Sequence, residues 1–185
     1  MSFMSRSVPL IFQGEANECG LACVCMILNY FGNQSELASL RRAQGDGRPL
    51  SLEAISNIAE SHHLAVRALR CEPEDLTKLQ LPVIAHVDFD HFVVIDRCSR
   101  SSLSLLDPAS GKLTASMKTF SNRFTGIIIE ARPTPDFKKD RGIKPSRTIE
   151  FLAKLPITRL SGSLAALLLL SVVTQAFALI TVTFR

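Results

Sequence analysis

The sequence has 185 residues, of which 46% are hydrophobic and 21% charged, and its formal net charge is +4. This length fits one ordinary domain with an additional segment, and the hydrophobic content excludes global disorder. The charge is too small to indicate a nucleic-acid partner, and no Lys/Arg cluster is interleaved with aromatic residues. Five cysteines follow a polar N-terminus without a secretory signal peptide, so we expect reduced thiols in a cytosolic compartment.

The first half of residues 10–132 has the patterns of helices. Residues Cys19–Tyr30 are apolar nearly all round, which is typical of a helix buried in a core, with Asn17 as its expected cap and Gly32 as its stop. Ser51 is expected to cap a second helix. Its apolar residues recur at helical spacing and share one face: Leu52, Ile55, Ile58 and Ala59.

The second half of this region has the patterns of strands. Five short segments rich in Val, Ile and Leu are separated by turn-forming residues. They cover residues 65–69, 82–87, 91–96, 102–106 and 126–130. Because helices come first and an antiparallel sheet follows, the order predicts an α+β domain over residues 1–132.

The C-terminal part predicts an attachment to a membrane. Residues 133–159 contain a linker rich in Pro, Asp and Lys and then a short amphipathic segment that is expected to lie at a membrane surface. Residues 160–184 carry no charge and are long enough for one transmembrane helix across a hydrocarbon core of about 30 Å. A buried core helix is the alternative, because Ser, Thr and Gln dilute the run. Basic residues lie before this run at Arg141, Lys144, Arg147, Lys154 and Arg159, with Arg185 alone after it, which favours a cytoplasmic location for the domain.

Cys19 is the candidate nucleophile. It begins the buried helix, where the helix dipole favours a thiolate, and Gly20 is expected to leave space beside the sulfur for a substrate carbonyl. Cys23 and Cys25 lie deeper in the same helix and are expected to be buried and inert. The alternative is that Cys19 is simply a core cysteine.

His91 is the candidate base, since it begins a strand after a polar turn, whereas His86 lies inside an apolar strand and is expected to be a core histidine. Asp107 follows the next strand and is a candidate for orienting the imidazole, or a residue that only initiates a turn. Gln13 is a candidate oxyanion donor, although on position alone it is an ordinary polar residue.

A metal site is a further alternative, because His86, Asp88 and Asp90 alternate along one strand face. The sequence has no G-x-x-x-x-G-K-[ST] loop, so a nucleotide site is not expected.

These segments resemble a known family. Gln13-Gly-Glu-Ala-Asn-Glu-Cys19-Gly-Leu-Ala-Cys23 resembles the nucleophile segment of the bacteriocin-processing cysteine peptidases, the papain-like N-terminal domains of peptidase-containing ABC transporters. His91-Phe-Val-Val is similar to the histidine strand of that family, and Leu106-Asp107-Pro-Ala-Ser-Gly111 to its aspartate turn. The region after Phe124 is similar to the colicin V secretion branch.

The resemblance implies a papain-like fold and an endopeptidase that removes double-glycine leaders from bacteriocin or microcin precursors during export. It makes Cys19 the nucleophile, His91 the general base, Asp107 the orienting carboxylate and Gln13 the oxyanion donor. It also implies a shallow hydrophobic groove for the leader and a location in the bacterial inner membrane. The alternative is a non-catalytic module that docks export substrates.

The sequence is shorter than the transporters it resembles. Residues 160–184 would be the first span of a truncated transporter, with membrane lipid, the remaining transporter parts or a second copy as partners. No cofactor is expected, because ATP would serve only the ATPase domain of a full-length transporter, for which this sequence has no motif.

Overall fold

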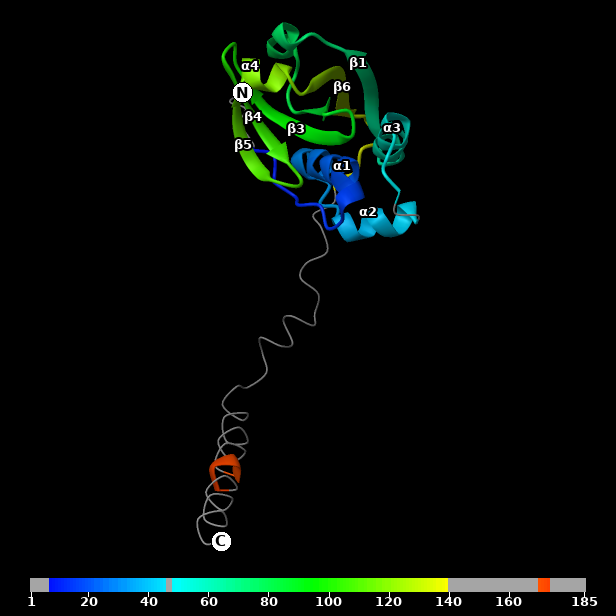
Figure 1. Ribbon diagram of the computed structural model, residues 1–185. Helices are drawn as coiled ribbons and strands as arrows, with labels where there is room; N and C mark the ends of the chain where they lie inside the picture. The colour runs from blue at the N-terminus through cyan, green and yellow to red at the C-terminus, as the bar shows by residue number, and fades with distance from the viewer. Residues whose placement is uncertain (1–6, 46–47, 140–169, 174–185) are drawn as a thin grey trace. The chain divides into compact units, whose positions relative to one another are not determined.

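A computed structural model describes residues 7–45, 48–139 and 170–173 of the chain (Figure 1). The chain divides into two compact units, Met1–Gly142 and Ile143–Arg185. All elements named below belong to the first unit; in the second, residues 170–173 are helical.

Three α-helices come first, as the sequence predicts for two of them: α1 (Cys19–Phe31), α2 (Leu37–Gln44) and α3 (Leu52–Ser61). Helix α1 is buried from Cys19 to Leu28 and ends at Gly32, whose positive φ of 101° lets its N–H reach the carbonyls of Leu28 and Asn29. The predicted cap at Asn17 is wrong, because the 3₁₀ turn η1 (Ala16–Glu18) precedes α1 and places Glu18 at the cap position. The predicted cap at Ser51 is confirmed, since its hydroxyl accepts from the N–H of Ala54 at 3.1 Å.

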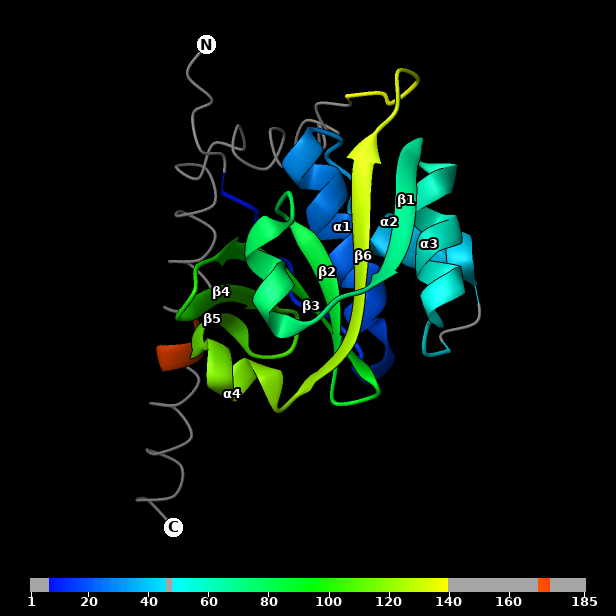
Figure 2. The ribbon, with the colours of Figure 1, turned by 90° about the horizontal axis from the view of Figure 1, so that it is seen from above.

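Six antiparallel strands form one sheet in the order β1-β6-β2-β3-β4-β5 (Figure 2). The strands are β1 (Leu64–Arg70), β2 (Val83–Val87), β3 (His91–Cys98), β4 (Ser102–Asp107), β5 (Gly111–Ser116) and β6 (Phe124–Pro133). Five of them match the predicted segments. β5 was missed because it is an edge strand of mostly exposed Lys, Thr and Ser, without the apolar alternation of a half-buried strand.

The two faces of the sheet are covered by different elements. Because side chains alternate along a strand, Ile84, Val94, Leu106 and Ile129 point to the face on which α1 and α3 pack. The other face packs beneath the turn η2 (Pro73–Lys78) and the short helix α4 (Met117–Ser121), through Leu76 and Phe120. The expected α+β arrangement of helices on an antiparallel sheet is therefore confirmed.

This arrangement brings three chain segments together at one edge of the domain. Helix α1 begins there, β3 begins there, and β4 ends there with the turn that leads into β5 (Figure 1). The N-terminal segment also passes this point, since the N–H of Gln13 donates to the carbonyl of Pro108 at 3.0 Å. Residues distant in sequence thus become neighbours.

The predicted C-terminal elements fall mostly outside the described residues. Residues 140–159 are not described, and of the predicted span at residues 160–184 only residues 170–173 are. Within the described ranges, no helix has the length and apolarity needed to cross a bilayer. After β6 the described chain continues to residue 139, and the ring of Phe137 packs edge-on against that of Phe31 with centroids 6.4 Å apart.

Candidate active site

Cys19 is the first residue of α1, and only 7% of its surface is exposed. Its position at the N-terminus of a 13-residue helix puts unpaired backbone N–H groups beside the sulfur. Gly20 also has a packing role, since a Cβ there would lie 2.7 Å from Cδ1 of Ile55 in α3; its expected role beside the sulfur stays a prediction. The small residue is needed for close packing of α1 against α3.

His91 and Asp107 form a hydrogen-bonded pair. His91 Nε2 lies 2.8 Å from Asp107 Oδ1, and the Asp107 carboxylate also accepts from the N–H of Ala109 at 2.8 Å. Asp107 is only 4% exposed. Since Nε2 is engaged by the aspartate, Nδ1 is the imidazole nitrogen left for Cys19, and the ring is held between the two side chains.

The electrostatics of this group favour a thiolate–imidazolium pair. Burial raises the pKa of Cys19, but hydrogen bonds from His91 and from the N–H of Phe92, together with the charge of His91, lower it below its ordinary value. The hydrogen bond to Cys19 raises the pKa of His91 to about 9, against the opposing effect of burial and with further help from Asp107. Burial also raises the pKa of Asp107, yet its bonds to His91 and Ala109 bring the net pKa below its ordinary value.

The other four cysteines are in different environments. Burial raises the pKa of each of them, to about 12 for Cys25 and well above its ordinary value for Cys23, which is fully buried one turn below Cys19. All five thiols are free. Cys19 is therefore the one cysteine whose surroundings favour the reactive thiolate.

Gln13 lies near this group but is held mainly by its backbone. Its N–H donates to Pro108, the residue after Asp107, and its side-chain Nε2 donates weakly to the carbonyl of Ala16 at 3.4 Å. Its Oε1 is buried and has no hydrogen-bond partner in the described structure. A role as oxyanion donor requires the side-chain amide to turn toward the sulfur, so this role stays a prediction.

Glu18 is a feature of the site that the sequence did not indicate. It is a buried carboxylate directly before Cys19, and it forms an ion pair with Arg41 of α2. Residues 23 positions apart on different elements give no pattern in a single sequence, so this pair could be found only from the fold.

The turn between β2 and β3 is also specialised. Asp88 and Phe89 both have positive φ, 53° and 67°, which is unfavourable for residues other than glycine. Arg123 holds the turn, because its guanidinium bonds to the Asp88 carboxylate at 2.5 and 2.9 Å and its carbonyl accepts from the N–H of Asp88 at 2.8 Å. The ring of Phe89 is left 87% exposed.

An apolar groove of about 410 Å³ lies beside this turn, between the start of α3 and strands β2, β3 and β6. Its walls include Leu50, Leu52, Phe89, Phe92 and Ile127. Leu50 lies close to Gly20, since a Cβ on that glycine would be 3.5 Å from Cβ of Leu50. The groove therefore lies close to the start of α1, of which Cys19 is the first residue.

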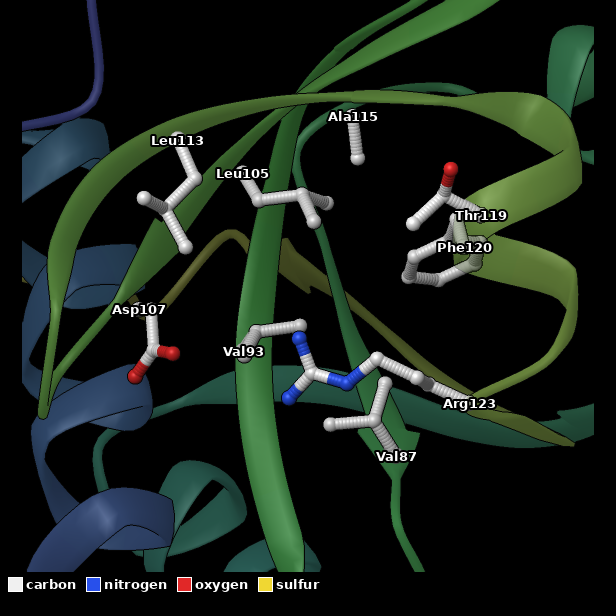
Figure 3. Close-up of a pocket in the computed structure, with 9 residues that line it drawn as sticks. All are labelled: Val87, Val93, Leu105, Asp107, Leu113, Ala115, Thr119, Phe120 and Arg123. Carbon is white, nitrogen blue, oxygen red and sulfur yellow. The ribbon is translucent and has the colours of Figure 1, made fainter.

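A second, smaller cavity lies behind Asp107 (Figure 3). Its volume is about 30 Å³, which is room for one or two water molecules but not for a peptide side chain. Its walls are mostly aliphatic, with the Asp107 carboxylate and the Arg123 guanidinium at its border. The apolar lining keeps Asp107 away from bulk water and so strengthens its interaction with His91.

The alternative metal site is not supported. Among residues 7–45, 48–139 and 170–173, no three His, Cys, Asp or Glu side chains are grouped so that they could hold a metal ion. Asp88 is instead paired with Arg123, and His86 Nδ1 lies 2.9 Å from the Thr125 hydroxyl, as expected for a structural histidine.

A cysteine at the start of a buried helix, facing a histidine–aspartate pair on an antiparallel sheet, defines a papain-like cysteine peptidase domain. Comparison with known proteins agrees with this class. A model of the peptidase C39 family matches residues 7–136, so the chain belongs to the peptidase C39 family, whose members are cysteine peptidases.

Relatives of known name align with nearly the whole chain. It is 37% identical over 179 residues to the probable microcin-H47 secretion/processing ATP-binding protein MchF of Escherichia coli. It is 38% identical over 176 residues to the colicin V secretion/processing ATP-binding protein CvaB of Escherichia coli. Each alignment covers 95% of this chain but 25% of the relative, so the chain spans about a quarter of the length of these curated relatives.

Solved structures show the same fold. A double-glycine-motif protease from an AMS/PCAT transporter, in complex with the leader peptide, is 34% identical with a TM-score of 0.65, and the match covers 70% of this chain and 94% of that one. The peptidase domain of Streptococcus ComA is 21% identical with a TM-score of 0.63, over 69% of this chain and 99% of that one, which shows the shared fold.

Proposed function

We propose that this chain cleaves the double-glycine leader from bacteriocin- or microcin-type precursor peptides, with Cys19 as the nucleophile. The observation that carries the proposal is the grouping of Cys19, His91 and Asp107, in which the thiol pKa is lowered and the imidazole pKa is raised. The family membership and the 34% identity to a double-glycine-motif protease support the choice of substrate.

The reaction follows from the roles proposed for these residues. The Cys19 thiolate attacks the carbonyl carbon of the second glycine, and the resulting oxyanion accepts hydrogen bonds from the Cys19 N–H and the Gln13 amide. His91 then protonates the departing amine, so that the C–N bond breaks and a thioester to the leader remains. His91 next accepts a proton from water, which attacks the thioester, releases the leader with a free carboxylate and regenerates Cys19.

The apolar groove supports recognition of the leader. Its walls between α3 and the sheet offer Leu50, Phe92 and Ile127 to apolar side chains of a peptide whose scissile bond lies at Cys19. A leader that places apolar residues along this groove would bury them from water, and each buried methylene contributes about 0.8 kcal/mol. The rest of the binding energy would come from the peptide backbone near the sulfur.

Export is the proposed context of the cleavage. The relatives MchF and CvaB are named secretion/processing ATP-binding proteins, and their alignments extend through 95% of this chain. We infer that residues 160–184 cross the bacterial inner membrane, with the peptidase domain on the cytoplasmic side, and that the remaining transporter parts act with it.

The experiment that tests the activity uses the purified chain and a synthetic precursor with a Gly-Gly leader, with the products identified by mass spectrometry. We expect one cut after the second glycine, no cut by Cys19→Ala, and normal cutting by the matched variant Cys98→Ala. Replacement of the second glycine of the precursor by leucine should also prevent the cut. Binding of the precursor by wild type without any cleavage would contradict the proposal and favour a docking module.

A further inference from the structure

Glu18 and Asp107 are the two buried charged residues of the described structure. Asp107 bonds to His91, whereas the mechanism proposed above assigns no task to Glu18. Burial of a carboxylate costs free energy unless it is paired and hydrogen-bonded. The contacts that compensate this cost show what Glu18 holds in place.

The Glu18 carboxylate closes the chain segment before Cys19 into a compact loop. Its Oε2 accepts from the backbone N–H groups of Gly14 at 2.9 Å and Glu15 at 3.1 Å, and from Nη2 of Arg41 at 2.8 Å. Nε of Arg41 bonds to Oε1. The hydrogen bond to Arg41 lowers the Glu18 pKa despite the opposing effect of burial, so the carboxylate stays ionised at neutral pH.

The loop joins the two residues that are proposed to handle the oxyanion. Gln13 precedes Gly14 at its start, and Cys19 follows Glu18 at its end. The bond to the Gly14 N–H fixes the peptide plane directly after Gln13. On its other side, Gln13 is fixed by the bond from its own N–H to Pro108.

Gly14 is needed for the contact between Glu18 and Arg41. A Cβ at this position would lie 2.6 Å from Nη2 of Arg41 and 3.2 Å from Oε2 of Glu18. A side chain here would therefore push the guanidinium away from the carboxylate. Close approach of Arg41 depends on glycine at this position.

We propose that Glu18 is a positioning residue that fixes the backbone beside Gln13 through the Gly14 N–H, so that the Gln13 amide can reach the oxyanion when it turns toward the sulfur, with Arg41 holding the carboxylate in place. This inference rests on the proposed function, because it needs a reaction with an oxyanion. Glu18 touches neither substrate nor the reacting atoms. Its effect is indirect, because it fixes the peptide group that joins Gln13 to Gly14.

A positioning role and a general stabilising role predict different kinetics. If Glu18 acts through Gln13, its loss should lower kcat while KM stays nearly unchanged, since the oxyanion exists only after attack. Replacement of Glu18 should also lower kcat only slightly when Gln13 is already replaced, because Glu18 would then have no oxyanion donor to position. If Glu18 only stabilises the fold, its loss should have the same effect with or without Gln13.

The test is a double-mutant cycle on the full chain with a Gly-Gly precursor, using Glu18→Gln, Gln13→Ala and the combination. Loss of one oxyanion donor costs about 100-fold to 1,000-fold in kcat. We expect Glu18→Gln to lower kcat by about tenfold or more in the Gln13 background and by less than about threefold after Gln13→Ala. Glu18→Asp should keep part of the rate, because a carboxylate retains the charge that holds Arg41 and can still accept from the Gly14 N–H.

Two further variants make the test specific. Gly14→Ala should lower kcat as Glu18→Gln does, since it displaces Arg41 without removing any charge. Glu130→Gln is the matched control, because it breaks a comparable ion pair with Arg67, 2.6 Å long, on strands away from the site, and its kcat should stay that of wild type. Thermal unfolding of each variant shows whether it is folded.

A second measurement separates this inference from the proposed function. A peptide aldehyde ending in Gly-Gly forms a hemithioacetal with Cys19, and its oxygen occupies the oxyanion position without turnover. We expect Glu18→Gln to bind the aldehyde more weakly than wild type, and we expect no further weakening when Gln13 is also replaced. The inference would be overturned, even if wild type cleaves, if Glu18→Gln lowered kcat equally with and without Gln13. It would also be overturned if Glu18→Gln left aldehyde binding unchanged. Wild type that neither cleaves nor binds the aldehyde would overturn both.

Discussion

Cys19 has a lowered pKa although it is buried, because His91 and nearby N–H groups stabilise the charged form more than burial opposes it. His91 in turn keeps its proton above neutral pH, since both of its neighbours are anions in this state. The two shifts have opposite directions and the same cause. Each group holds the other in the form that the proposed reaction needs.

The rate of cleavage should therefore show a bell-shaped dependence on pH. kcat/KM should rise with pH as Cys19 ionises, below the ordinary cysteine pKa of about 8.5, and fall near pH 9 as His91 loses its proton. Asp107→Asn should move the upper limb to lower pH, because it removes a charge that raises the His91 pKa. An upper limb that stays in place in this variant would show that Asp107 does not act on the imidazole.

At the scale of residues, the sequence was informative where a reactive side chain lies at the start or end of a predicted helix or strand. Cys19 at a helix start, His91 at a strand start and Asp107 at a strand end were predicted, and the structure places all three together. Their catalytic roles remain predictions. The ion pair of Glu18 with Arg41 was not predicted, because it depends on how α2 packs beside the start of α1.

At the scale of elements, the turn between β2 and β3 combines strain with exposure. A bulky side chain with positive φ costs about 1–3 kcal/mol, and such residues persist where the surrounding structure holds them. At Asp88, the ion pair with Arg123 stabilises this backbone conformation. The result is an aromatic ring in solvent at the wall of the apolar groove.

Phe89→Gly should separate stability from function. Relief of the positive φ should stabilise the unit Met1–Gly142 by about 1 kcal/mol in urea unfolding, after allowance for the greater chain entropy of glycine. The same change should raise KM for a Gly-Gly precursor several-fold, as the groove loses part of its wall. A KM that does not change would mean that the ring makes no contact with the peptide.

The contact of α1 with α3 gives a second prediction at this scale. Gly20→Ala places a methyl group 2.7 Å from Cδ1 of Ile55, and such overpacking costs about 1–3 kcal/mol, more than the helix propensity that alanine gains. Urea unfolding should show the loss. Ile55→Val removes that δ-carbon, so the double variant should recover most of the stability. Equal additive losses in the double variant would contradict the packing explanation.

At the scale of the whole molecule, the order of helices and strands was sufficient to predict the α+β class. The position of β6 in the sheet was not predictable, because pairing with β1 and β2 depends on contacts between segments far apart in sequence. β5 was missed for another reason: an edge strand whose residues are mostly exposed and polar resembles a loop.

Membrane attachment is the prediction that belongs to the whole chain. In bacterial cells the full chain should sediment with the membrane fraction and resist extraction by salt, because residues 160–184 are uncharged and long enough to span the bilayer. A chain ending at residue 139 should stay in the supernatant. Release of the full chain by salt alone would indicate a peripheral attachment.

The pairing of β6 has a consequence for synthesis of the protein. All four proposed catalytic residues lie at or before Asp107, yet β6 (Phe124–Pro133) inserts between β1 and β2. During translation, a nascent chain that already contains Gln13, Cys19, His91 and Asp107 still has a sheet divided into two parts. The sheet can be completed only after Pro133 has left the ribosome, so the surroundings that position Cys19, His91 and Asp107 are complete only once β6 is in place.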